Sequence, residues 1–255
     1  MSRITLEIHD GRADVVLDSP ERANALDLTA AEEFEAAIER VTAGAGDGSV
    51  RVLVIRANGK HFCVGGDLRE FDSKGDEIGL HIARVTQALH SAIVAIDALP
   101  IPVITVVQGS VAGAGVGLAY LGDITLVAED SVTRLAYTAV GLSPDGSSSY
   151  TLTRLLGPKL AGSLLLTNRP VTAADAVAWG LATRAVPAAD LAAETDAVVG
   201  TLLAGSPESY AATKRLVRAA QTNSLVEQLA EEQRSISELA VTPYARAAIH
   251  SFASR

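Results

Sequence analysis

Short apolar runs and amphipathic segments alternate along the first two thirds of the chain, and this pattern predicts alternating strands and helices. Ile4–His9 and Ala13–Leu17 alternate apolar and polar positions around an Asp-Gly pair, as in a β-hairpin. Continuous apolar runs predict three buried strands, at Val50–Arg56, Val103–Val107 and Ile124–Ala128. A further short strand is expected near the end of this region, at Ala182–Val186.

Helical spacing of apolar residues predicts a helix over Leu28–Val41, with Thr29 as its N-cap and a glycine-rich turn over Thr42–Ser49. A second long helix is expected over Ile78–Leu99, because two prolines follow directly. From Ser147 onward almost everything has a helical pattern. We therefore expect an α/β core over residues 1–190 and a helical C-terminal region over residues 191–255.

Composition and charge narrow the class of protein. Apolar residues make up 48% of the 255 residues and the formal net charge is −9, which argues against a nucleic-acid binder or a membrane-surface protein. No apolar run is long enough to cross a membrane, and the single cysteine, Cys63, fits a reducing cytoplasm. The histidines are scattered and no dinucleotide fingerprint is present, so neither a metal nor a separate cofactor is expected.

Two segments share one layout, in which a buried strand leads through a glycine-rich turn into a helix start. The first contains Gly65-Gly66-Asp67 and the second contains Gly113-Ala114-Gly115. Small residues let a ligand approach the backbone closely, and the free N–H groups at a helix N-terminus carry partial positive charge. Two such turns can direct two N–H donors at one oxygen, which is what a thioester enolate requires.

The chain resembles the crotonase, or enoyl-CoA hydratase/isomerase, superfamily in four motifs that occur in order along it: PERANAL, FCVGGDL, QGSVAGAGVGLA and LLTNRPVTAADAVAWGLATRAV. The resemblance implies a spiral of ββα units followed by C-terminal helices that form trimers, often paired as hexamers. It also implies that the oxyanion hole consists of the backbone amides of Gly66 and Ala114, although the family usually has glycine at the second position.

The same resemblance implies where an acyl-coenzyme A thioester binds. Arg22 would contact a phosphate, since its guanidinium suits that geometry. The other positions implied to contact the coenzyme are Ala23, Ala25, Asp67, Leu68, Phe252 and Arg255, the last two from a neighbouring subunit.

The resemblance implies a reaction other than that of a classical hydratase, because the two positions where hydratases of this family have glutamates hold Gly117 and Tyr137. A carboxylate occurs instead at Asp145, at a spacing that resembles the branch containing 3-enoyl-CoA/2-enoyl-CoA isomerases and phenylacetyl-CoA epoxide isomerases. Such an isomerase needs one base, which moves a proton from the α to the γ carbon. The alternative role for Asp145 is to cap the helix predicted near Ser147.

Two rival functions remain open. The chain also resembles 4-chlorobenzoyl-CoA dehalogenase, which implies Asp145 as nucleophile, His90 as the base that activates water, and Tyr137 in place of a halide-binding tryptophan. A non-catalytic acyl-CoA-binding homologue would explain the missing glutamates equally well. A nucleophilic pair of Cys63 with His61 is a weaker possibility.

Overall fold

The computed structural model describes residues 2–254, and its largest element is a six-stranded sheet in the order β1-β2-β3-β4-β6-β9. The hairpin of β1 and β2 is antiparallel and all other neighbours in this sheet are parallel. The strands are β1 (Ile4–His9), β2 (Arg12–Leu17), β3 (Val52–Ala57), β4 (Val103–Val107), β6 (Ile124–Ala128) and β9 (Arg184–Val186).

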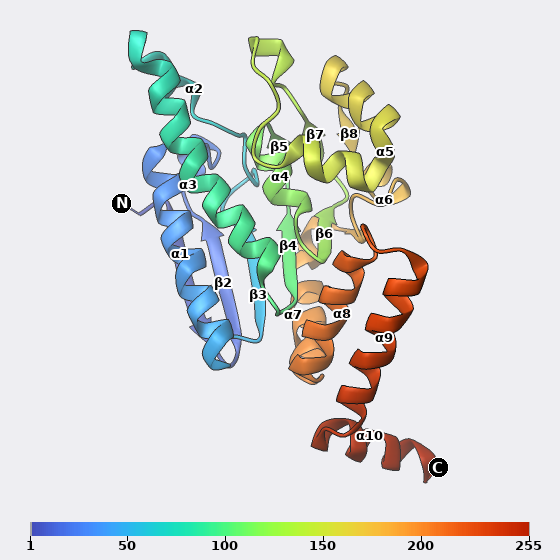
Figure 1. Cartoon of the computed structure of the whole chain (residues 1–255). Coiled ribbons are helices and arrows are strands. Elements are labelled where there is room, and N and C mark those ends of the chain that lie inside the picture. The colour runs from blue at the N-terminus through green and yellow to red at the C-terminus, as the bar shows by residue number, and fades with distance from the viewer. Residues whose placement is uncertain (1, 255) are drawn as a thin grey trace.

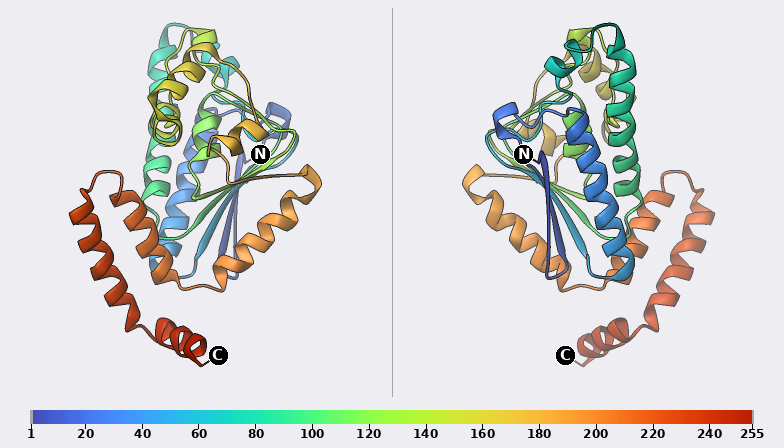
Figure 2. Two further views of the ribbon diagram at one scale, coloured as in Figure 1. Left: turned by 90° about the vertical axis from the view of Figure 1, so that its right-hand side faces the viewer. Right: turned by 90° about the vertical axis from the view of Figure 1, so that its left-hand side faces the viewer.

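Helices cover both faces of this sheet, which explains why its central strand β4 is buried at every position (Figure 2). Helices α1 (Leu28–Asp47) and α3 (Ile78–Ala98) cover one face, where Phe34 and Leu89 pack with Leu53 and Ile55. Helix α7 (Leu191–Leu203) covers the other face, where its apolar side chains pack with the alternate positions of β3 and β4.

A second, three-stranded sheet consists of β5 (Ser110–Ala112), β7 (Val132–Arg134) and β8 (Val171–Thr172). Cys63 pairs with Val111 in an isolated parallel bridge and so extends this sheet by one position. The chain therefore repeats one path: a strand in the large sheet, a strand or bridge in the small sheet, then a helix. This is the expected spiral of ββα units, and each passage from the small sheet to a helix forms a turn on the same side of the core.

The remaining helices are α2 (Leu68–Asp72), α4 (Ala114–Tyr120), α5 (Ser148–Thr167), α6 (Ala173–Ala178), α8 (Pro207–Ala219), α9 (Leu225–Ala240) and α10 (Pro243–Ala253). Helix α4 is buried at every residue in the centre of the molecule. The last three helices extend away from the core and end at the C-terminus (Figure 1). Within residues 2–254, no helix has the length and apolar character that crossing a bilayer requires.

Several predicted elements are confirmed and three details are wrong. Helix α1 begins behind Asp27, whose carboxylate accepts from the Ala30 N–H at 2.8 Å, so Thr29 is not its N-cap. The predicted turn over 42–49 is instead the last part of α1, which ends at Asp47. Three short strands, β5, β7 and β8, are absent from the prediction because each is too short to show a period.

Candidate active site

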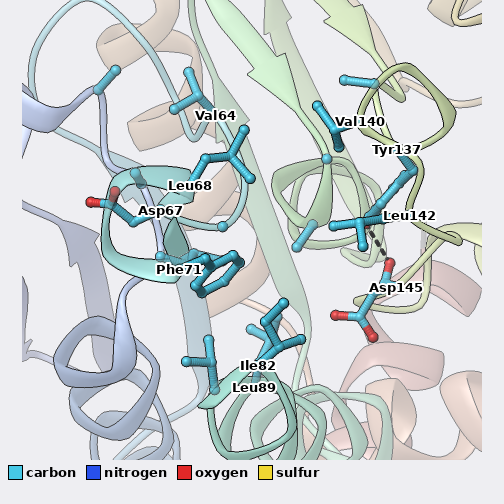
Figure 3. A pocket seen from close by; sticks show the side chains of 18 of the residues that line it. Val64, Asp67, Leu68, Phe71, Ile82, Leu89, Tyr137, Val140, Leu142 and Asp145 are labelled. Atoms are coloured by element: carbon cyan, nitrogen blue, oxygen red, sulfur yellow. Dashed lines mark hydrogen bonds between the residues drawn. The ribbon is translucent and has the colours of Figure 1, made fainter. Parts of the chain in front are cut away.

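A cavity of about 1050 Å³ lies between the two glycine-rich turns, helix α3 and the segment that precedes α5 (Figure 3). Its wall includes the predicted site residues Gly66, Ala114, Tyr137 and Asp145. The predicted coenzyme contacts Arg22, Ala23, Ala25, Asp67 and Leu68 line the same cavity. Segments from both ends of the spiral core thus meet at one site.

The two turns that lead into α2 and α4 lie side by side. The Ala112 N–H donates to the Cys63 carbonyl at 2.9 Å, and a methyl group on Gly65 would lie 3.2 Å from the Ala114 nitrogen. Gly65 has φ +89° and Gly113 has φ +51°, so both positions need a residue without a side chain. Such conformations reverse the chain and leave the following N–H groups at the cavity wall.

The backbone amides of Gly66 and Ala114 are the two donors predicted for the oxyanion hole. Both residues line the cavity, and within residues 2–254 neither N–H donates to a protein acceptor. Ala114 is the first residue of α4, so the partial positive charge of that helix end adds to its N–H. The methyl group of Ala114, in place of the usual glycine hydrogen, leaves this donor available.

Asp145 lies on the cavity wall and does not cap a helix. The N-cap of α5 is Ser147, and no side chain accepts a capping hydrogen bond there. The Asp145 carboxylate extends toward the side of the cavity bordered by Leu142, Ile82 and Leu89 (Figure 3). The helix-cap alternative for this residue is therefore excluded by the geometry.

Tyr137 holds the backbone at Asp145. Its hydroxyl donates to the Asp145 carbonyl oxygen at 2.7 Å and lies 3.2 Å from the Ser148 hydroxyl. Burial raises the pKa of Tyr137 to about 12, against the smaller opposite effect of these hydrogen bonds. The phenol is therefore a permanent donor at neutral pH, and its hydrogen is directed at a backbone carbonyl.

Residue 117 is the position of the first missing glutamate, and the backbone of Gly146 fills the space beside it where a side chain would lie. A methyl group on Gly117 would lie 1.6 Å from the carbonyl oxygen of Gly146. Gly146, at φ +57°, in turn packs against Ala114, since a methyl group on it would lie 3.1 Å from the Ala114 Cβ. No side chain fits at residue 117, and the segment that fills this space is the one that carries Asp145.

His90, on α3, contacts the carboxylate of Asp145. Its Nε2 is 2.7 Å from Asp145 Oδ1, and its side chain is 51% exposed against 28% for Asp145. His90 does not line the main cavity but a neighbouring surface groove. The role of Nε2 in this pair depends on the tautomer of the ring: Nε2 can donate to an ionised Asp145 carboxylate and can accept from a protonated one.

Charged groups surround the mouth of the cavity. The Arg22 guanidinium is paired with the carboxylates of Asp67 and Asp27, and these pairs raise its pKa against the effect of burial. Arg69 also lines the cavity, is exposed, and makes no ion pair with any residue in the described range 2–254. Arg69 is thus a free cation at the mouth that the sequence analysis missed, although its place directly after Asp67-Leu68 was a usable signal.

Other candidate residues lie apart from this site. Phe252 is on α10, is 72% exposed and does not line the cavity, and Arg255 lies outside the described residues. Cys63 is completely buried, and burial raises the pKa of its thiol to about 12, so it is not a nucleophile. His61 accepts from the Ser110 N–H through Nδ1 at 3.2 Å. Residues 2–254 contain no cluster of metal-ligating side chains.

A ββα spiral that places two adjacent amides at the wall of one cavity has the geometry that polarisation of a bound carbonyl oxygen requires. The family model described as enoyl-CoA hydratase/isomerase matches residues 7–255. The "Probable enoyl-CoA hydratase" of Rhodobacter capsulatus is 32% identical over 98% of this chain and 94% of its own. The trans-2-decenoyl-[acyl-carrier-protein] isomerase of Streptococcus mutans is 32% identical over 84% of this chain and 81% of its own.

A solved structure agrees with these sequence relatives. The enoyl-CoA hydratase from Polaromonas sp. JS666 superposes with a TM-score of 0.91 at 31% identity, over 98% of this chain and 96% of the other. The chain belongs to the enoyl-CoA hydratase/isomerase family and has the crotonase fold. Relatives with hydratase names and with isomerase names are both present, so the reaction has to be argued from the site itself.

Proposed function

We propose that this protein is an acyl-CoA isomerase that converts a 3-enoyl thioester into the conjugated 2-enoyl thioester, with Asp145 as the single base. The observation that supports this most strongly is the position of Asp145, which lines the cavity together with the Gly66 and Ala114 amides and does not cap α5. Hydration by two glutamates has no support, because Gly117 and Tyr137 occupy those positions and the Gly146 backbone fills the space of the first.

The proposed reaction needs one proton acceptor and one oxyanion site. The thioester oxygen accepts hydrogen bonds from the amides of Gly66 and Ala114, which become stronger as negative charge develops on it. Asp145 removes a proton from C2, and the electron pair of that C–H bond is delocalised over the dienolate. Asp145 then returns a proton to C4, so the double bond moves into conjugation and the carboxylate is regenerated.

The lining of the inner cavity favours an aliphatic acyl group. The apolar side chains that line the cavity with Asp145 come from α2 and the turn before it, from α3 and from the segment before α5, and they are almost all branched aliphatic: Val64, Leu68, Ile82, Val85, Leu89, Val140 and Leu142. Phe71 is the one aromatic ring among them besides Tyr137. An aryl-CoA dehalogenase has less support, because the Tyr137 hydroxyl donates to the Asp145 carbonyl and is not free to bind a halide.

Activity on defined thioesters tests the proposal. Wild-type protein is expected to form the conjugated product from 3-enoyl-CoA, followed by the absorbance of the conjugated thioester, and to hydrate 2-enoyl-CoA poorly. Asp145→Asn keeps the size of the side chain and removes the base, so its kcat should fall by at least about 100-fold. Full activity in Asp145→Asn would refute the assignment of the base.

The rival functions give different results in the same experiment. A covalent acyl–aspartyl adduct at Asp145, detected by mass spectrometry after rapid quenching, would support a hydrolase or dehalogenase. Tight binding of acyl-CoA with no turnover of any thioester in the panel would support a non-catalytic homologue. Either result contradicts the isomerase proposal.

We propose that His90 connects the base with solvent. The proton that Asp145 removes lies one hydrogen bond from the His90 ring, which is half exposed. In D2O, deuterium should therefore enter the product at C4, and His90→Ala should retain more of the original C2 hydrogen at C4. Equal deuterium content for wild type and His90→Ala would show that His90 does not relay the proton.

The C-terminal helices provide the surface for the self-association that the family resemblance implies. Large apolar side chains on α9 and α10 are exposed in the single chain, among them Leu225, Val226, Leu229, Ile236 and Ile249. A monomer rarely exposes so many apolar residues on adjacent helices. We propose a trimer, and sedimentation velocity of wild type and Leu229→Glu would distinguish a trimer, a hexamer and a monomer.

A further inference from the structure

Arg22 lies at the cavity mouth, yet its guanidinium is directed at two protein carboxylates. One terminal nitrogen pairs with Asp67 Oδ2, and the other lies 3.2 Å from Asp27 Oδ2. Both aspartates are nearly buried, with side chains 7% and 5% exposed. Asp27 Oδ2 has a second cationic partner, Arg3 Nε at 2.7 Å, so the carboxylate that depends on Arg22 is Asp67. A buried carboxylate that loses its partner is strongly destabilising.

The two carboxylates that Arg22 joins are both helix N-caps. Asp27 accepts from the Ala30 N–H at the start of α1. Asp67 accepts from the N–H groups of Arg69 and Glu70, at 3.0 and 3.1 Å, at the start of α2. The planar fork of arginine reaches both carboxylates at once, which a lysine ammonium does not do in the same way. Arg22 therefore fixes the start of α2 relative to α1.

The residue that precedes Asp67 is Gly66, whose amide is proposed to bind the thioester oxygen. Backbone hydrogen bonds on both sides of this glycine join it to the segment after Arg22: the Leu26 N–H donates to Gly65 O at 2.8 Å, and the Asp67 N–H donates to Leu26 O at 3.0 Å. A displacement of Asp67 would therefore rotate the peptide that carries the Gly66 N–H.

We propose that Arg22 is a positioning residue for the oxyanion hole: by joining Asp27 to Asp67, it holds the Gly66 amide in the direction that the enolate oxygen needs. This inference rests on the proposed function of the Gly66 and Ala114 amides. It differs from the phosphate contact implied by the family resemblance, because the guanidinium is already paired with two carboxylates.

Arg69 is the matched control for this inference. It is two residues beyond Asp67, lines the same cavity mouth, and forms no ion pair with any residue between 2 and 254. A coenzyme phosphate would pair with a free guanidinium at lower cost than with one that must first leave two carboxylates. Loss of Arg69 should therefore weaken binding of the coenzyme, whereas loss of Arg22 should slow the chemical step.

The experiment compares Arg22→Gln and Arg69→Gln with two substrates, a 3-enoyl-CoA and the same acyl group on N-acetylcysteamine, which has no phosphate. Arg22→Gln is expected to lower kcat by about 10- to 100-fold on both substrates and to change KM for the CoA substrate by less than about threefold, because displaced donors cost this much. Arg69→Gln is expected to raise KM for the CoA substrate only. The inference is overturned if Arg22→Gln raises KM for the CoA substrate and leaves the truncated substrate unaffected, or if it has no effect on either.

Three further variants, one of them a double variant, keep the outcome interpretable. Asp67→Asn retains a capping oxygen but loses the ion pair, so it should show the same loss of kcat as Arg22→Gln. Because both substitutions remove the same ion pair, the double variant should be no slower than the slower of the two single variants. If Arg22→Gln does not fold, Arg22→Lys provides the test, and normal kcat in Arg22→Lys would then refute the inference. If Asp145→Asn is inactive but Arg22→Gln has normal activity, only the role of Arg22 is refuted. If the wild-type protein isomerises neither substrate, the proposed function and this inference are refuted together.

Discussion

Replacing Gly117 by alanine tests whether the missing glutamate and the new carboxylate depend on one another. The added methyl carbon would lie 1.6 Å from the Gly146 carbonyl oxygen and 2.7 Å from its carbonyl carbon. Unbonded heavy atoms prefer separations of about 3.5–4.0 Å, so the Gly146 carbonyl must move by roughly 2 Å. The obstructing atoms are backbone, which cannot rotate away as a flexible side chain would.

The expected cost has a thermodynamic and a catalytic part. Overpacking a tight interior destabilises a protein by about 1–3 kcal/mol, and backbone obstruction places Gly117→Ala near the upper end. At about 2–4 °C for each kcal/mol in a chain of this size, the midpoint of thermal unfolding should fall by roughly 5–10 °C. Asp145 is bonded directly to Gly146, so it should move by about 1 Å or more relative to the oxyanion amides and lose about 100-fold in kcat.

The assay combines thermal unfolding with 3-enoyl-CoA turnover measured well below the unfolding midpoint. Gly200→Ala is the control, because this glycine lies in α7 with no atom within 4 Å of the added methyl group. It should be neutral or stabilise the fold by about 0.5–1 kcal/mol through improved helix propensity. Wild-type kcat and stability in Gly117→Ala would refute the argument. So would hydratase activity in Gly117→Glu, since the structure leaves no room for that side chain.

Three other variants test separate parts of the site. Tyr137→Phe should lose about 0.5–1.5 kcal/mol of stability and roughly tenfold in kcat, because the Asp145 carbonyl loses its donor; unchanged kcat would exclude a positioning role. Burial raises the pKa of Tyr137 to about 12, so the stability that it contributes in wild type should be complete below about pH 10 and decline as the pH rises toward 12, as urea unfolding at several pH values would show. Burial alone would raise the pKa of Asp67, but its bonds to Arg22, Glu70 and Arg69 outweigh burial and lower it. Arg22→Gln should therefore destabilise the protein by about 1.5–3 kcal/mol at pH 7 and by progressively less as the pH falls below about 4, where Asp67 becomes protonated in the unfolded chain before it does so in the folded protein; a pH-independent loss would contradict the pairing. Cys63→Ala should keep wild-type kcat, and the native Cys63 thiol should resist aromatic disulfide reagents until the protein unfolds, because it is buried with a pKa of about 12.

Local pattern was sufficient to predict the strands of the large sheet and the two glycine-rich turns. Buried parallel strands need apolar residues at every position, and Gly65 and Gly113 have conformations that only glycine adopts easily. The end of α1 was wrong for a reason that lies elsewhere in the chain. The helix continues through Gly44 because the Val50 side chain closes over it, and a methyl group at Gly44 would lie 2.6 Å from Val50 Cγ2.

Hydrogen bonds and ion pairs between residues far apart in the chain could not be predicted from local sequence pattern. The motif around Arg22 indicated a charge near a ligand, but its carboxylate partner Asp67 is 45 residues away. His90 and Asp145, 55 residues apart, were singled out through the resemblance to the dehalogenase, and only the fold shows that they share a hydrogen bond. Such contacts depend on how the ββα units stack, which no local period encodes.

The absence of the first glutamate and the presence of Asp145 are two consequences of one backbone contact. With no side chain at residue 117, the Gly146 carbonyl lies directly against α4, and the αL conformation of Gly146 lets the chain turn there toward α5. That turn brings Asp145 to the cavity wall within the reach of the Tyr137 hydroxyl and of His90. A glutamate at residue 117 would exclude the Gly146 segment and with it the aspartate. The two arrangements of acid groups are therefore mutually exclusive on this backbone, so a single substitution that adds the glutamate should abolish the existing activity without creating a hydratase.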